Sequence, residues 1–103
     1  MGYVYLLTDG ELYKIGVTRG SIDRRIKKLQ TGNPYDIVMV AYHITDYPFK
    51  VEKMLHSRYG CKRFNNEWFE LHPDDVVGFA DECRKCEDII SALSGNPFFM
   101  KKS

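Results

Sequence analysis

Phenol and cationic side chains are concentrated near the start of this 103-residue chain. Tyrosines and a lysine lie in two short runs of strand-forming residues, and an arginine-rich segment follows at once. Between Lys14 and Lys28 there are six basic residues against one acid, Asp23. Lysine and arginine neutralise phosphate oxygens, and such a cluster is typical of a surface that meets a polyanion. We therefore interpret this segment as a working surface that contacts phosphates.

Arg25 has the most informative position among these basic residues. One apolar stripe at helical spacing is formed by Ile22, Ile26 and Leu29. Arg25 lies three residues after Ile22 and four before Leu29, so it falls on this inward-facing stripe. An unpaired guanidinium on such a face carries a large desolvation cost. The side chain must therefore reach solvent, pair with a carboxylate or line an anion pocket, and the helical spacing alone favours an arginine at the edge of the stripe that reaches solvent.

Glu52 and His56 form a second pair of polar residues with suggestive spacing. They lie one turn apart in a helical pattern, so their side chains can touch. The ordinary interpretation of Glu52 is a surface acid that pairs with His56 or Lys53. Residue type and spacing alone favour that ordinary interpretation.

Two tyrosine-containing runs flank Asp9-Gly10 and predict a β-hairpin at the start of the chain. This dipeptide favours a two-residue type I′ turn, with strands at about 3–8 and 11–17. Side chains alternate along a strand, so Tyr3 and Tyr5 share one face. By the same rule Tyr13 and Lys14 point to opposite faces.

The rest of the chain predicts helices packed on a small sheet. The expected elements are a helix capped by Ser21, a central strand over Asp36–Thr45, a helix from Pro48 to about Tyr59, a short strand over Glu67–Leu71 and a last helix from about Pro73 to Leu93. Residues 60–66 are expected to form a basic loop. We predict one α+β domain over residues 1–103, with a core over about 2–71 and a C-terminal helix over about 73–94. Its sheet is expected to be mixed, mostly antiparallel and three- to four-stranded.

The order of several short motifs resembles the GIY-YIG nuclease superfamily. The resemblance rests on Tyr3-Val4-Tyr5, Tyr13-Lys14-Ile15-Gly16-Val17-Thr18, Arg25-Ile26-Lys27-Lys28-Leu29, Glu52 with Leu55-His56, and Glu67-Trp68-Phe69. These runs are similar to the phage- and virus-associated subgroup of the family, and they cover about Gly2 to Leu71. Lys14 stands at the tyrosine position of the second motif, as it does in that subgroup.

The resemblance implies a metal-dependent endonuclease that hydrolyses phosphodiester bonds, with DNA as the expected substrate. It implies Tyr5 as the base or the water-orienting phenol and Arg25 as the phosphate clamp. It implies Glu52 as the protein ligand of one divalent metal ion, Mg²⁺ or Mn²⁺. Lys14 would add a cation to this site if it faces Tyr5 across the hairpin.

Further candidates lie around the four catalytic ones. Supporting positions near the site are assigned to Tyr13, His56 and an asparagine late in the motif order. Asn65 and Asn66 could both be this asparagine, and we take Asn66 as the candidate. Contacts with nucleic acid are assigned to Arg19, Arg24, Lys27 and Lys28. Tyr13 and Lys14 face opposite ways along the strand, so Tyr13 cannot take over the motif position that Lys14 occupies.

Composition excludes several other classes of protein. Apolar residues make up 44% and charged residues 28%, which is a globular composition. No apolar run approaches the ~18 residues of a membrane span, and no basic-then-apolar leader opens the chain, so we expect a soluble intracellular protein, in the cytoplasm or a host-cell interior. Cys83 and Cys86 have the spacing of half a zinc site, but such a site needs about two more ligands. We interpret both as ordinary helix residues.

Two alternatives belong to other functional classes. A non-catalytic nucleic-acid-binding module would keep the basic helix without turnover. A protein-interaction domain would show no salt-dependent affinity for DNA. For the nuclease, a separate DNA-targeting domain does not fit in 103 residues, so we expect recognition to come from a homodimer or a targeting partner.

Overall fold

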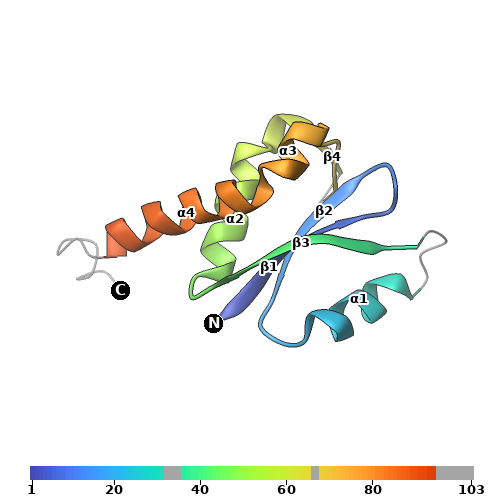
Figure 1. The fold of residues 1–103 in the computed structure, drawn as a ribbon, viewed down its shortest axis with the longest axis horizontal. Coiled ribbons are helices and arrows are strands. Elements are labelled where there is room, and N and C mark those ends of the chain that lie inside the picture. The colour runs from blue at the N-terminus through green and yellow to red at the C-terminus, as the bar shows by residue number, and fades with distance from the viewer. Residues whose placement is uncertain (32–35, 66–67, 95–103) are drawn as a thin grey trace.

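A hairpin of two antiparallel strands, β1 (Gly2–Thr8) and β2 (Tyr13–Thr18), lies at the centre of the fold (Figure 1). The computed structural model describes residues 1–31, 36–65 and 68–94. β3 (Val38–Thr45) pairs with β1, while β5 (Trp68–Phe69) pairs with β2 and carries β4 (Arg63–Asn65). The order β3-β1-β2-β5-β4 gives one sheet whose neighbouring strands are all antiparallel.

Five helical segments complete the described part of the chain. They are α1 (Ile22–Gln30), α2 (Pro48–Arg58), the 3₁₀ turn η1 (Gly60–Lys62), α3 (Pro73–Val77) and α4 (Phe79–Ser94). The predicted α+β class is confirmed, and so is the cap of α1, because the Ser21 hydroxyl accepts from the Arg24 N–H at 3.3 Å. In the described part of the chain, no helix is both long and apolar enough to cross a bilayer.

The hairpin turn differs from the prediction. Thr8 pairs with Tyr13, so the loop has four residues, and the second strand begins two residues later than expected. Asp9 is the reason, because its carboxylate accepts the N–H groups of Glu11 and Leu12, both at 2.9 Å. These bonds hold the pKa of the Asp9 carboxyl below its usual value. Gly10 has a φ of 107°, a conformation that glycine adopts without strain.

Three other expectations about the elements need correction. β3 is an edge strand and not the central one, and five of its eight residues are exposed. The loop expected over residues 60–66 instead contains η1 and β4, which raises the strand count to five and leaves no parallel pair among the described strands. The last helix is divided at Gly78 into α3 and α4.

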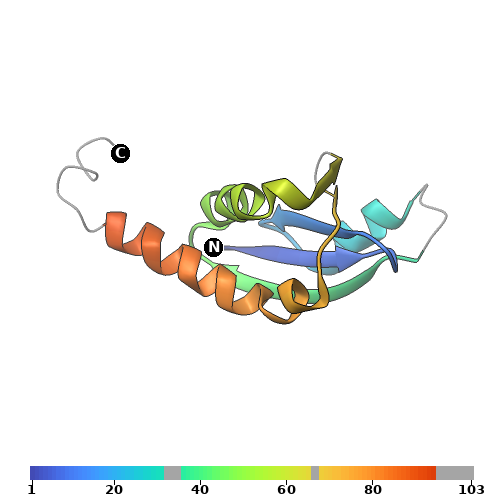
Figure 2. The same ribbon diagram turned by 90° about the horizontal axis from the view of Figure 1, so that it is seen from above.

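The two faces of the sheet are covered by different helices. α2 and α4 pack on the face that carries Val4, Leu6 and Ile15, where eleven buried residues form the larger core. α1 covers the other face, where Tyr5, Leu7 and Ile37 form a smaller buried cluster. Figure 1 shows α1 on one side of the hairpin and α2 and α4 on the other. In Figure 2, α2 lies towards β2 and α4 towards β3.

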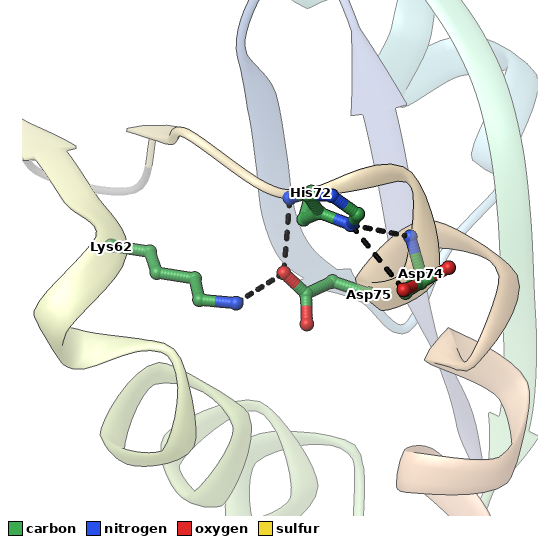
Figure 3. A network of polar contacts seen from close by, with 4 residues as sticks. All are labelled: Lys62, His72, Asp74 and Asp75. Atoms are coloured by element: carbon green, nitrogen blue, oxygen red, sulfur yellow. Dashed lines mark hydrogen bonds and ion pairs between the residues drawn. The ribbon is translucent and has the colours of Figure 1, made fainter.

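A polar network fixes the segment between the sheet and the C-terminal helices (Figure 3). The Asp75 carboxylate accepts from the His72 backbone N–H at 3.0 Å and pairs with the Lys62 ammonium group. The His72 ring in turn accepts from the Asp74 N–H at 3.2 Å, which completes a capping box on α3. The Lys62 contact holds the pKa of the Asp75 carboxyl below its usual value. The network therefore ties η1, and with it β4, to the start of α3.

Candidate active site

Tyr5 is the buried centre of the candidate site. It lies in the middle of β1, points to the α1 face and is 1% exposed. Its register partner on β2 is Gly16, and a Cβ atom added there would lie 2.5 Å from both Cζ and the hydroxyl oxygen of Tyr5. The phenol therefore crosses β2 directly over Gly16. Gly16 leaves room for the phenol because it has no Cβ atom.

Arg25 meets this phenol from α1. Its Nε–H donates to the Tyr5 hydroxyl oxygen at 3.1 Å. Ile26 and Leu29 dock the same helix against the cluster that contains Tyr5 and Leu7. Arg25 is half-buried, as its place on the inward-facing stripe predicts. A guanidinium that is partly withdrawn from water attracts an anion more strongly than an exposed one does, because screening is weaker there.

Lys14 faces the same side of the sheet as Tyr5. It lies two residues before Gly16 on β2, is 8% exposed, and is paired in register with Trp68. Its Nζ lies 5.7 Å from the centre of the Trp68 ring, within the range of a cation–π contact. Tyr13 points to the opposite face and packs against the larger core. The structure thus brings Lys14 to the Tyr5 face and leaves Tyr13 away from it.

His56 anchors α2 to the edge of β2. Its Nε2–H donates to the Ile15 carbonyl at 3.0 Å, and its Nδ1 lies 3.3 Å from the Arg63 guanidinium. Because Arg63 can only donate, these two contacts assign the neutral imidazole with the proton on Nε2. The ring also packs edge-on against Phe69, with centroids 5.2 Å apart. His56 therefore holds α2 in place beside the site.

Glu52 lies one helical turn before His56 on this same flank of α2. The N-terminal end of α2 lies near Thr18, because a Cβ atom added at Gly2 would meet both Pro48 at 2.9 Å and the Thr18 carbonyl at 3.0 Å. α2 thus runs along β2 from Thr18 to Ile15, which brings half-buried Glu52 beside β2 near Gly16. The Tyr5 phenol crosses β2 at this position on the α1 face, whereas α2 packs on the opposite face.

The other basic candidates surround this group at the surface. Arg19, Arg24, Lys27 and Lys28 are all exposed on α1 or the turn before it. The Arg19 guanidinium lies 5.2 Å from the centre of the Phe49 ring, which ties that turn to the start of α2. Asn65 is exposed on β4, two strands from β2. Asn66 lies outside the described residues.

The donor set limits which metal ion could bind. Among the described residues, no group of three or more histidine, cysteine, aspartate or glutamate side chains could hold an ion. Glu52 supplies a hard oxygen donor, and a single carboxylate suits Mg²⁺, which keeps several water ligands and takes others from a phosphate. Cys83 and Cys86 are fully buried in the larger core, where burial raises the pKa of the Cys83 thiol to about 12. Their environment disfavours a thiolate site.

Two contributors to the site escaped prediction from the sequence. Arg63 lies in the segment expected to be a loop, and it bonds to His56 across the sheet edge. Trp68 is half-buried against Lys14, while its neighbour Phe69 is fully buried. The contact between Trp68 and Lys14 depends on the register in which β5 pairs with β2. That register cannot be read from the sequence.

The fold and the site define a small α+β domain in which a hairpin phenol and a helix guanidinium meet on one face of an antiparallel sheet. The chain belongs to the T5orf172 domain family, a phage-associated family whose model matches residues 2–86. The match includes every described candidate residue. No curated protein and no solved structure matches the chain.

Proposed function

We propose that this T5orf172 domain is a metal-dependent endonuclease of the GIY-YIG type, with DNA as its substrate. The observation that carries the proposal is the 3.1 Å bond from Arg25 to the Tyr5 hydroxyl, made where the phenol crosses Gly16. Two side chains twenty residues apart thus meet on one face of the sheet at β2, the strand along which α2, with Glu52, packs from the other face. Phosphodiester hydrolysis needs such a combination of a water-activating group, a cation and a metal-binding carboxylate.

Tyr5 and Arg25 would act together on the attacking water and the phosphate. The Nε–H of Arg25 holds the phenol oxygen in one orientation, and the adjacent positive charge favours negative charge on that oxygen. A phenol in this state can orient a water molecule or accept its proton. The remaining N–H groups of a guanidinium suit the non-bridging oxygens of a phosphate. Lys14, on the same face, adds a second cation that favours the same charge.

Glu52 would hold the metal ion. When bound, a Mg²⁺ or Mn²⁺ ion neutralises charge that develops on the phosphate and on the leaving oxygen. His56 keeps the Glu52 flank of α2 beside β2 through its bond to the Ile15 carbonyl. A neutral imidazole with both nitrogens engaged is suited to positioning this helix and not to transferring a proton during turnover.

The four exposed cations of α1 and its preceding turn would contact the nucleic-acid backbone. If Arg19, Arg24, Lys27 and Lys28 each neutralise one phosphate, log affinity should fall with log salt concentration with a slope of about −3.6. A slope near zero would instead favour the protein-interaction domain.

Plasmid nicking tests the proposal. Wild-type protein should nick supercoiled DNA in Mg²⁺ or Mn²⁺ and stop when the metal is chelated. Glu52→Gln and Arg25→Ala should each reduce the rate by about 100-fold or more. Glu70→Gln is the matched control, because Glu70 is an exposed carboxylate on the chain after β5. Salt-dependent DNA binding without cleavage in either metal would reject the enzyme and favour the non-catalytic binding module.

A further inference from the structure

A surface hollow of about 570 Å³ lies on the α1 side of the sheet, and Arg25 is not among the residues that line it. One wall is formed by Tyr3, Met39 and Tyr42 from β1 and β3. The opposite wall is the turn from Arg19 to Asp23 at the start of α1. The volume lies within the range of small-molecule sites in proteins, which is roughly 300–1,000 Å³.

The aromatic wall of the hollow is continuous with the candidate active site. Tyr42 is the register partner of Tyr5 on β1, so both side chains point to the same face of the sheet. Tyr3, two residues before Tyr5, also points to this face, and its ring lies 5.9 Å from that of Tyr42 in an edge-on arrangement. Tyr42 is 49% exposed although it lies within a strand. Two adjacent tyrosines on an open sheet face offer a stacking surface for a flat ring.

The wall formed by the turn carries one positive side chain, Arg19, and one negative side chain, Asp23. These two charges indicate which chemical groups a ligand could place there. Arg19 is exposed at the rim, where Phe49 restrains its guanidinium, and it suits a phosphate outside the hollow. Asp23 would repel a phosphate placed inside the hollow. Its carboxylate would accept a hydrogen bond from the exocyclic amino group of a nucleobase, as carboxylates do from cytosine. The arrangement therefore suits a base in the hollow with its phosphate at the rim.

We propose that this hollow, named here the base pocket, binds one unpaired nucleobase of the strand to be cleaved. The inference rests on the proposed nuclease function and specifies its substrate. Tyr42 on β3 and Gly16 on β2 are two strand spacings apart, about 10 Å. This spans about three base steps of a B-form strand at ~3.4 Å each. In an intact duplex the bases are stacked and paired, so such a base must come from a single strand or a frayed end.

Binding to defined oligonucleotides tests the base pocket. Fluorescence anisotropy would be measured without metal, so that cleavage cannot occur, on four probes: oligodeoxycytidine, an abasic oligomer of equal length, a blunt duplex and a duplex with a single-stranded end. Tyr42→Ala should weaken binding of oligodeoxycytidine by about 5- to 150-fold, because stacking on one aromatic residue contributes about 1–3 kcal/mol per base. Binding of the abasic oligomer and of the blunt duplex should hardly change. The duplex with a single-stranded end shows whether a frayed end suffices.

Two further variants separate stacking from a loss of structure. Tyr42→Phe keeps the ring and should bind as the wild type does. Ile44→Ala is the matched control, because Ile44 lies on the same strand and face, is 48% exposed and is absent from the hollow. Equal losses on oligodeoxycytidine and on the abasic oligomer, or no loss with Tyr42→Ala, would overturn the base pocket while leaving cleavage intact. Absence of all nucleic-acid binding would instead overturn the nuclease proposal and this inference with it.

Discussion

Gly16→Ala is the substitution that tests the site geometry most directly. The added Cβ would lie 2.5 Å from Cζ and from the hydroxyl oxygen of Tyr5, and 2.7 Å from Cε1. Carbon atoms pack at about 3.5–4.0 Å, so the phenol must move by about 1 Å. Tyr5 is 1% exposed and packs in the cluster that Ile26 and Leu29 cover, so this movement strains the α1 interface.

Both stability and catalysis should respond to this strain. Overpacking of this kind costs about 1–3 kcal/mol, and each kcal/mol corresponds to about 4–8 °C in Tm for a domain of this size. A shift of about 1 Å would also lengthen the 3.1 Å bond from Arg25 beyond the hydrogen-bond range. Misplacing a catalytic group by about 1 Å costs roughly 100-fold in rate. We therefore expect a moderately destabilised protein with very low nuclease activity.

Urea unfolding and plasmid nicking would be measured on Gly16→Ala and on Gly60→Ala. Gly60 is the matched control, because a Cβ atom added there meets nothing within 4 Å. In a Tyr5→Leu background, the alanine at residue 16 should cost much less stability, since the phenol that it displaces is absent. If Gly16→Ala proves as stable and as active as Gly60→Ala, the crossing of the phenol over β2 is not what positions the site.

Two more predictions concern the residues around the site. Asp75→Asn should lower the free energy of unfolding by about 1 kcal/mol at neutral pH, by weakening the capping box and the Lys62 contact. The folded-state pKa of Asp75 is lowered, so its contribution is fully present above the unfolded value of about 3.8 and is lost as pH falls through the lower folded value. Urea titrations at neutral pH and near pH 3 should show the gap between wild type and variant closing in acid; a constant gap would contradict the ion pair. His56→Ala should destabilise the domain by about 1–3 kcal/mol, because it leaves the Ile15 carbonyl without its donor. His56→Ala should also slow plasmid nicking, because α2 would shift and displace Glu52. Unchanged nicking kinetics would show that His56 does not position α2.

Periodicity predicted the elements of the site well, because helices and strands repeat over short distances. The apolar stripe of α1 placed Arg25 towards the sheet, and the structure confirms this orientation through the bond to Tyr5. Alternation in β2 separated Lys14 from Tyr13, and the two faces are confirmed. Both predictions depend only on residues that are close in the sequence, within two helical turns or within one strand. The catalytic roles of these residues remain predictions.

Features that depend on tertiary packing could not be predicted in the same way. β3 was expected at the centre of the sheet because both of its faces are apolar, yet Tyr42 and Ile44 remain half-exposed on its open face. Hydrophobicity reports the preference of a side chain but not whether another element arrives to cover it. Likewise, the bond from His56 to the Ile15 carbonyl joins residues 41 positions apart, and it exists only because α2 docks along β2.

The unequal cores on the two faces of the sheet connect stability with function. Of the residues that the structure describes, eleven form the larger core between the sheet and α2 with α4, whereas three form the buried cluster beneath α1, and α1 itself buries no residue fully. Apolar burial dominates the free energy of folding, so α1 is held less firmly than α2 or α4. Arg25 reaches Tyr5 only while α1 is docked. A phosphate bound by Arg25 beside Tyr5 would therefore also stabilise the docked position of α1, because a ligand favours the state that binds it. In the proposed nuclease, substrate binding and assembly of the site are then one equilibrium, while the larger core keeps the rest of the domain folded.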